Sequence, residues 1–131
     1  MKRMPLPGGD LEYAVLAALW NKGSASAKEI HVDIGEPAGL VYTTIAKVLD
    51  RLHEKTLVKR ELIGKAFLYR PAVPRERVER ARTRAALSRL LGPEPRPAMA
   101  HLVDAVESID PTLLDDLARM VEERRRSRRG S

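Results

Sequence analysis

The most regular apolar pattern in the chain lies between residues 41 and 52. Apolar side chains recur there at intervals of three or four residues, namely Val41, Ile45, Val48, Leu49 and Leu52. This spacing predicts a helix with one buried face, because one turn of helix takes 3.6 residues. The opposite face carries Thr43, Lys47, Asp50 and Glu54, with Thr44 and Arg51 on one flank.

Two helices are predicted before this one. Residues 10–22 have apolar residues at helical spacing, with Asp10 as the candidate N-cap and a stop at Gly23. Ser26 can cap a short second helix, because Glu29 stands three residues later and completes a capping box. The Gly- and Pro-containing segment 35–39 then breaks the chain. This order predicts a helix-turn-helix.

A hairpin follows the third predicted helix. Residues 57–61 and 66–70 resemble short strands, and Gly64 between them tolerates the positive φ of a tight turn. Lys65 then lies at the tip, with other basic residues along the strands. A basic hairpin beside a helix-turn-helix is typical of a wing, which touches the phosphate backbone or minor groove of DNA.

In a helix-turn-helix the first turns of the second helix enter the major groove, where hydroxyls and cations meet base edges and phosphates. The pattern therefore predicts DNA contacts at Thr43, Thr44, Lys47, Arg51 and Lys65. Asp50 and Glu54 are expected to face away from the phosphates. A surface helix of any protein also carries such polar residues, so the neighbouring elements decide the interpretation.

The second half of the chain predicts three more helices. The first runs from Arg75 to a stop at Gly92, after which Pro93, Pro95 and Pro97 are expected to form a stiff elbow. The last begins with Asp110 as its cap and Pro111 in its first turn. Their apolar stripes consist of Leu87, Leu90, Leu91, Leu102, Val103, Val106, Leu113, Leu114, Leu117, Met120 and Val121.

These stripes are too small to form an independent core, so they are expected to pack against a second copy of the chain. A twofold dimer would present two recognition helices to a pseudo-palindromic operator, with half-sites about one DNA turn or a multiple of it apart. The alternative is that the helices fold back onto their own winged domain.

Charge is unevenly distributed. The chain has 24 basic and 18 acidic residues, a net charge of +6 and a pI near 10, which fits a nucleic-acid binder. Residues 1–72 carry 11 basic and 8 acidic side chains, whereas residues 73–123 carry 8 and 10. Five arginines lie between Arg124 and Arg129. One interpretation is that they attract phosphates. The other, which we favour, is that they suit the negative end of the last helix and a solvated, disordered tail.

Several kinds of site are not indicated by the sequence. There is no cysteine, which excludes disulfides and Cys-based metal sensing, and His31, His53 and His101 lack metal-ligand spacing. We find no phosphate-cradling Gly loop and no general acid/base pair, so no enzyme and no cofactor are predicted. No apolar run is long enough for a signal peptide or a membrane span, and we therefore expect a cytoplasmic protein.

From about Asp10 to Val121 the chain resembles the penicillinase and methicillin-resistance repressors, with the copper-operon repressors as relatives (the BlaI/MecI/CopY family). The most specific stretches are residues 11–20 (LEYAVLAALW), residues 41–55 (VYTTIAKVLDRLHEK) and the wing, which ends in Tyr69-Arg70-Pro71. The resemblance implies a homodimeric transcriptional repressor. It maps the recognition-helix contacts onto Tyr42, Thr43, Thr44 and Lys47, with Lys65 in the wing.

The chain departs from the family at three points. Thr56 stands where the family commonly has Gly after the recognition helix, which predicts a different helix end because a β-branched residue disfavours a left-handed cap. Antibiotic-responsive members are induced by a regulatory protease that cuts an Asn-Phe bond, and the similar position here is His101-Leu102. The C-terminal cysteines of the copper-responsive relatives are absent.

The sequence thus predicts a mainly α protein with a small β-hairpin. Residues 1–73 would form a winged helix-turn-helix DNA-binding domain, and residues 74–131 a helical dimerisation domain with a disordered basic tail from about residue 124. The predicted function is a sequence-specific repressor that binds double-stranded operator DNA as a homodimer. The alternatives are a winged-helix protein-interaction module and a regulator that responds to a small molecule.

Overall fold

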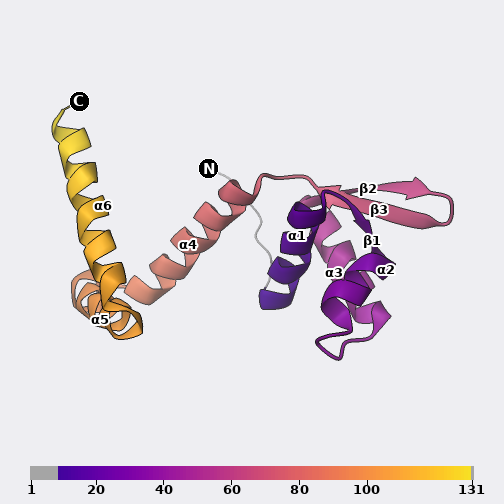
Figure 1. The fold of residues 1–131 in the computed structure, drawn as a ribbon, viewed down its shortest axis with the longest axis horizontal. Helices are drawn as coiled ribbons and strands as arrows, with labels where there is room; N and C mark the ends of the chain where they lie inside the picture. The colour runs from indigo at the N-terminus through magenta and orange to yellow at the C-terminus, as the bar shows by residue number, and fades with distance from the viewer. Residues whose placement is uncertain (1–8, 131) are drawn as a thin grey trace. The chain divides into compact units, whose positions relative to one another are not determined.

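The computed structural model describes residues 9–130, and its elements confirm the mainly α prediction (Figure 1). In chain order they are α1 (Asp10–Lys22), β1 (Ala25–Ser26), α2 (Ala27–Ile30), the π-helical turn η1 (His31–Gly35), α3 (Tyr42–Glu54), β2 (Val58–Ile63), β3 (Ala66–Pro71), α4 (Arg75–Leu91), α5 (Pro95–Ile109) and α6 (Pro111–Arg129). The chain forms two compact units that divide between Arg84 and Ala85.

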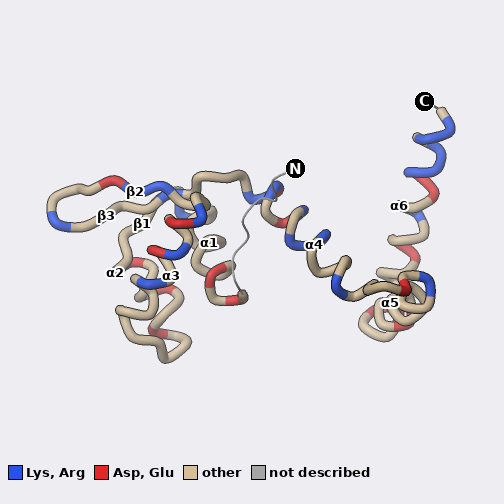
Figure 2. The backbone as a smooth tube through the Cα atoms, turned by 180° about the vertical axis from the view of Figure 1, so that it is seen from behind, with Lys and Arg blue, Asp and Glu red and all other residues tan. Residues whose placement is uncertain are grey.

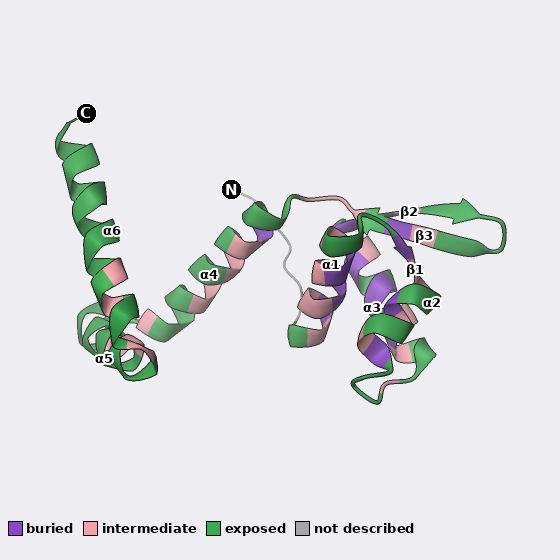
Figure 3. Ribbon diagram, in the orientation of Figure 1, coloured by how far each residue is buried: buried purple, intermediate pink, exposed green. Residues whose placement is uncertain are grey.

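The core of the first unit lies between α1, α3 and the sheet (Figure 3). The predicted stripe of α3 is buried at Ile45, Val48, Leu49 and Leu52, each with no exposed surface. Val41 is the exception, because it is the N-cap of α3 and remains 64% exposed. The helix therefore has the predicted face, but it begins one residue later.

The sheet has three antiparallel strands in the order β1-β3-β2, one more than predicted. The additional strand is β1, in which Ala25 pairs with Tyr69 and Ser26 with Leu68. A two-residue strand leaves no alternating pattern, so the sequence could not indicate it. The hairpin of β2 and β3 is longer than predicted, because Ile63 pairs with Ala66 and only Gly64 and Lys65 form the turn.

The helix ends follow the predicted chemistry in part. Ser26 and Glu29 form the expected capping box: the Glu29 amide donates to Ser26 Oγ at 3.2 Å, and the Ser26 amide donates to Glu29 Oε1 at 3.0 Å. At α1 the predicted cap is wrong by one residue, since Gly9 is the N-cap and Asp10 is already helical. Asp10 then lies in the first turn, where a carboxylate still suits the helix dipole.

The end of α3 contradicts the expectation for Thr56. This residue adopts φ 61°, its amide donates to His53 O, and the Leu57 amide donates to Leu52 O, both at 3.0 Å. These two bonds make the Schellman motif that usually ends in glycine. A β-branched residue thus occupies the left-handed position after all.

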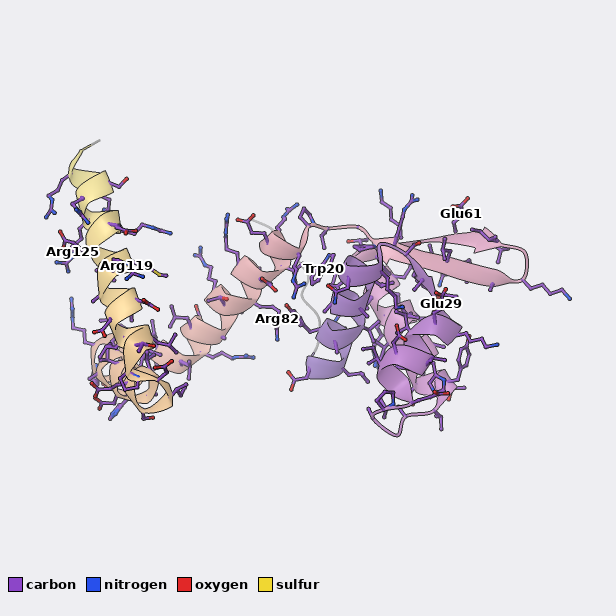
Figure 4. The ribbon with its side chains drawn as sticks, in the orientation of Figure 1. Trp20, Glu29, Glu61, Arg82, Arg119 and Arg125 are labelled. Atoms are coloured by element: carbon purple, nitrogen blue, oxygen red, sulfur yellow. The ribbon has the colours of Figure 1, made fainter. Side chains whose placement is uncertain are left out.

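The first turns of α4 pack against α1 within the first unit. Val78 is completely buried, and Tyr13 Oη donates to Glu79 Oε1 at 2.7 Å. Trp20 Nε1 donates to the Val73 carbonyl at 3.0 Å, and the Arg82 guanidinium lies 3.6 Å from the centre of the Tyr13 ring (Figure 4). The predicted boundary at residues 73 and 74 precedes α4, whereas the compact units divide within this helix.

The second unit contains the end of α4 together with α5 and α6, and α5 packs against α6. As predicted, Asp110 caps α6: its Oδ1 accepts the Thr112 amide at 2.9 Å, and Pro111 follows in the first turn. The predicted elbow is wrong at Pro95 and Pro97. Both lie in the first turn of α5, where a missing N–H costs no helical hydrogen bond.

The prediction of a disordered tail from about residue 124 is also corrected, because α6 continues to Arg129. Arginine is a good helix former, and cations near a helix C-terminus are favoured by the helix dipole. Arg129 Nη2 also reaches Glu122 Oε1 at 3.3 Å. The structure therefore presents all five arginines of this cluster on a regular helix.

Candidate nucleic-acid interface

The N-terminal turns of α3 present the predicted reading edge to solvent. Thr43 and Lys47 are exposed, Tyr42 is 47% exposed, and Thr44 is half-buried. Among the described residues, Lys47 has no carboxylate within ion-pair distance. These positions combine hydroxyls, an aromatic ring and an unpaired cation, which are groups that can contact base edges and phosphates in a major groove.

Arg51 differs from the other predicted contacts because it has a partner within the chain. Its Nε lies 3.7 Å from Glu12 Oε2 on α1, and Lys55 Nζ donates to the other Glu12 oxygen at 2.8 Å. The Glu12 side chain is only 10% exposed. Glu12 therefore ties the C-terminal half of α3 to α1, a role that periodicity alone could not reveal.

Asp50 is also paired, in this case with the wing. Arg60 Nη1 donates to Asp50 Oδ1 at 3.1 Å, and the Arg60 guanidinium lies 4.3 Å from the centre of the Phe67 ring. Arg60 thus joins α3 to both strands of the hairpin and neutralises a carboxylate on the outer face of α3. That Asp50 and Glu54 avoid DNA stays a prediction.

Sequence reasoning missed a contact that His31 makes at the start of the recognition helix. His31 Nε2 lies 2.9 Å from the Leu40 carbonyl oxygen, and because a carbonyl only accepts, Nε2 carries a proton. The ring also meets Tyr42 edge to face at 6.0 Å. Gly35 leaves room for it, since a Cβ there would lie 2.5 Å from the His31 ring. His31 thus links η1 to Leu40, just before α3, and to Tyr42, the first residue of α3.

The hairpin extends from the sheet as a wing, defined here as residues 58–71. Gly64 has φ 64° and enables the two-residue turn, with Lys65 at the tip (Figure 2). Lys59 lies directly opposite Arg70 across the strands. In the described part of the chain, none of these three cations has an ion-pair partner. Like charges in opposing positions destabilise a strand pair, which an external anion would relieve.

The second unit leaves its apolar stripes uncovered. None of the predicted dimerisation residues is buried, and their exposure reaches 66% at Leu90 and 56% at Met120. Leu102, Val106 and Leu114 are half-buried where α5 and α6 meet. These surfaces have the apolar character expected of an interface between copies.

The described residues also bear on metal binding and on membrane crossing. Among residues 9–130, no three His, Asp or Glu side chains gather in a way that could hold a metal ion. Within the same range, no helix is long and apolar enough to cross a lipid bilayer.

Comparison with known proteins places these features in a family. A family model described as "Penicillinase repressor" matches residues 8–123. Transcriptional regulator BlaI of two Mycobacterium tuberculosis strains is 31% identical over 116 residues, spanning 88% of this chain and 83% of the relative. The solution structure of the DNA-binding domain of the repressor BlaI is similar with a TM-score of 0.50 and 25% identity. It covers 57% of this chain and 90% of that domain.

Proposed function

The chain belongs to the penicillinase repressor family, and from this membership we propose that it represses transcription as a homodimer on a pseudo-palindromic operator. Its relatives are transcriptional regulators and not enzymes. Together with the BlaI-like winged domain they make this chain a DNA-binding transcriptional repressor. The homodimer, the form of the operator and the contact residues are our proposals.

The observation that carries the DNA contacts is the contrast between the two faces of α3. One face is completely buried, while the other presents Thr43 and Lys47 near the helix N-terminus, and Lys47 has no ion pair with any residue that the structure describes. We assign base reading to Tyr42, Thr43, Thr44 and Lys47, and a backbone or minor-groove contact to Lys65. Arg51 is a flanking phosphate contact, because its side chain is 54% exposed although it faces Glu12.

The homodimer is supported by the uncovered apolar residues of α4, α5 and α6. Complete burial of an apolar side chain of this size stabilises a protein by about 1.5–3 kcal/mol relative to leaving it in water. A twofold arrangement of copies would cover the same residues on each chain. The dimer would then occupy two half-sites and block transcription by occlusion. Sedimentation of the full chain at micromolar concentration tests this, and a monomeric mass would contradict it.

Release from the operator by a regulatory protease remains a prediction of the family resemblance. His101 and Leu102 lie inside α5, with His101 exposed and Leu102 half-buried. Cleavage between them requires this part of α5 to open, because proteases act on locally unfolded chain. A neighbouring gene for a membrane metalloprotease with a sensor domain would support this route.

Gel-shift titration tests the reading edge. The probe is the intergenic DNA upstream of the protein's own gene, compared with random DNA of equal length at physiological salt. Lys47→Ala should weaken the specific complex by roughly 1–3 kcal/mol if Lys47 reads a base, or lower the salt slope by about one if it meets a phosphate. Arg96→Ala, which removes one positive charge from α5, serves as the control. Equal binding to both DNAs would overturn the operator proposal.

A further inference from the structure

The two ends of α3 are held in different ways. In its C-terminal half, Arg51 pairs with a carboxylate of α1 and Asp50 with a guanidinium of the wing. At its N-terminus the cap residue is Val41, whose side chain accepts no hydrogen bond from the first turn. Ser, Thr, Asp or Asn usually occupies this position, because its oxygen accepts a free amide of that turn. The part of α3 that is proposed to read DNA therefore lacks the usual N-terminal cap.

The residue before this cap is held by η1 instead. The Leu40 amide donates to the Gly35 carbonyl at 2.9 Å. The Leu40 carbonyl oxygen accepts a hydrogen bond from His31 Nε2, also at 2.9 Å. Both backbone polar groups of Leu40 are thus bonded to residues 31–35. Because the peptide between Leu40 and Val41 is planar, these two bonds fix the direction in which the chain enters α3.

The His31 ring is itself confined by its neighbours. A Cβ at Gly35 would lie 2.5 Å from this ring and 2.9 Å from Ile45 Cγ1, so the glycine allows η1 to approach both the ring and α3. The ring also meets Tyr42, with 6.0 Å between the ring centres and 85° between the planes. This is an edge-to-face arrangement, which aromatic rings favour. One imidazole therefore contacts the residue before the cap and the first residue of the helix.

Tyr42 is one of the proposed base contacts, and it is 47% exposed, so core packing alone does not fix its ring. Base reading requires a side chain to be held within about 0.5 Å of its productive position. We propose that His31 is a positioning residue for base reading. Its N–H holds the start of α3, its ring holds the Tyr42 ring, and it acts through these groups without touching DNA. The inference rests on the proposed base contacts and adds a residue outside them.

Three substitutions of His31 separate its two contacts. His31→Gln keeps a side-chain N–H donor but removes the ring, His31→Phe keeps a ring but removes the donor, and His31→Ala removes both. His53→Ala makes the same change in the last turn of α3 and is the matched control. The readout is the ratio of the affinity for the intergenic DNA to the affinity for random DNA at physiological salt. Base contacts contribute to this ratio, whereas phosphate contacts contribute to both affinities.

His31→Ala should lower the ratio about tenfold, and His31→Gln and His31→Phe should each lower it about threefold, because each keeps one contact. The affinity for random DNA and the ratio for His53→Ala should stay unchanged. In Tyr42→Leu protein, His31→Gln should have no further effect, because the ring has already lost its partner while the donor remains.

Amide hydrogen exchange of the free protein supplies a readout that does not depend on DNA. His31→Ala should speed exchange at residues 44–46, in the first turns of α3, and leave residues 49–52 protected as in wild type. Faster exchange along all of α3, or an equal loss of affinity for both DNAs, would overturn the inference and leave His31 a role in stability alone.

An unchanged ratio for His31→Ala would also overturn the inference while leaving the repressor proposal intact. A wild-type protein that does not prefer the intergenic DNA would instead contradict the operator proposal. The exchange at residues 44–46 would then still decide whether His31 holds the start of α3.

Discussion

Replacing Thr56 by Gly should stabilise the protein. Thr56 is the left-handed residue of the Schellman motif after α3, with φ 61°. This conformation costs an L-residue roughly 1–2 kcal/mol, because Cβ crowds the following carbonyl. Glycine avoids that cost but loses about 0.5–1 kcal/mol more backbone entropy on folding. We therefore expect a net gain of about 0.5–1 kcal/mol.

Urea unfolding followed by circular dichroism measures this gain. Wild type and variant must be compared at one protein concentration, because association contributes to the apparent stability. For a chain of this size the gain corresponds to a rise in Tm of about 2–4 °C. DNA affinity should stay unchanged, since Thr56 lies at the end of α3 remote from its N-terminal turns.

Thr56→Ala is the matched control. It removes the β-branch and the hydroxyl that bonds the Lys55 carbonyl, but it retains a Cβ at the same positive φ. Its stability should stay within about 0.5 kcal/mol of wild type, because most of the left-handed strain persists. If Thr56→Gly is no more stable than wild type, or if alanine stabilises as much as glycine, the strain argument is refuted.

Three further predictions concern contacts that hold helices in place. Glu12→Gln should reduce the free energy of unfolding by about 1–2 kcal/mol, because the 2.8 Å bond from Lys55 loses its charged acceptor; a cycle with Lys55→Met should show coupling, and additive effects would contradict it. The pKa of Glu79 lies below its ordinary value of 4.5 because of hydrogen bonds from Tyr13 and then Arg75. This stabilisation is complete above the unfolded pKa and disappears as the pH falls through the folded pKa. Tyr13→Phe should therefore lower Tm more at pH 7 than at pH 3, and an equal loss at both would speak against the linkage. Asp110→Ala should cost about 1 kcal/mol by removing the cap of α6, whereas Asp110→Asn should be nearly neutral in the same melting experiment.

Local signals accounted for much of the fold. The end of α1 at Gly23 and the capping box at Ser26 depend on residues that are neighbours in sequence, and both were predictable. The pairing of β1 with β3 was not predictable, because the two strands are far apart in the sequence and β1 is too short to show a pattern. Thr56 shows a third case, in which packing of Leu57 and the Schellman bonds outweigh the preference of a single residue.

The candidate site shows the same division. Spacing alone predicted which face of α3 is exposed, and the structure places Thr43 and Lys47 on it. Spacing could not predict that Glu12 approaches Arg51, or that His31 bonds the Leu40 carbonyl, because these contacts depend on tertiary packing. The apolar residues near the tip of the wing were visible in the sequence, but their exposure became evident only when β1 was seen to stop at Leu68.

The docking of α4 has a consequence for moving this module between proteins. Val78 fills the core of the first unit. Glu79 accepts a hydrogen bond from the Tyr13 hydroxyl, and the Arg82 guanidinium lies over the Tyr13 ring, so both residues hold α4 against α1. A fragment that ends before α4 would carry every proposed DNA contact and still have an unfilled core. Gene fusions, domain exchanges and expression fragments built from this repressor should therefore keep the chain through residue 84, because the first turns of α4 complete the core of the first unit.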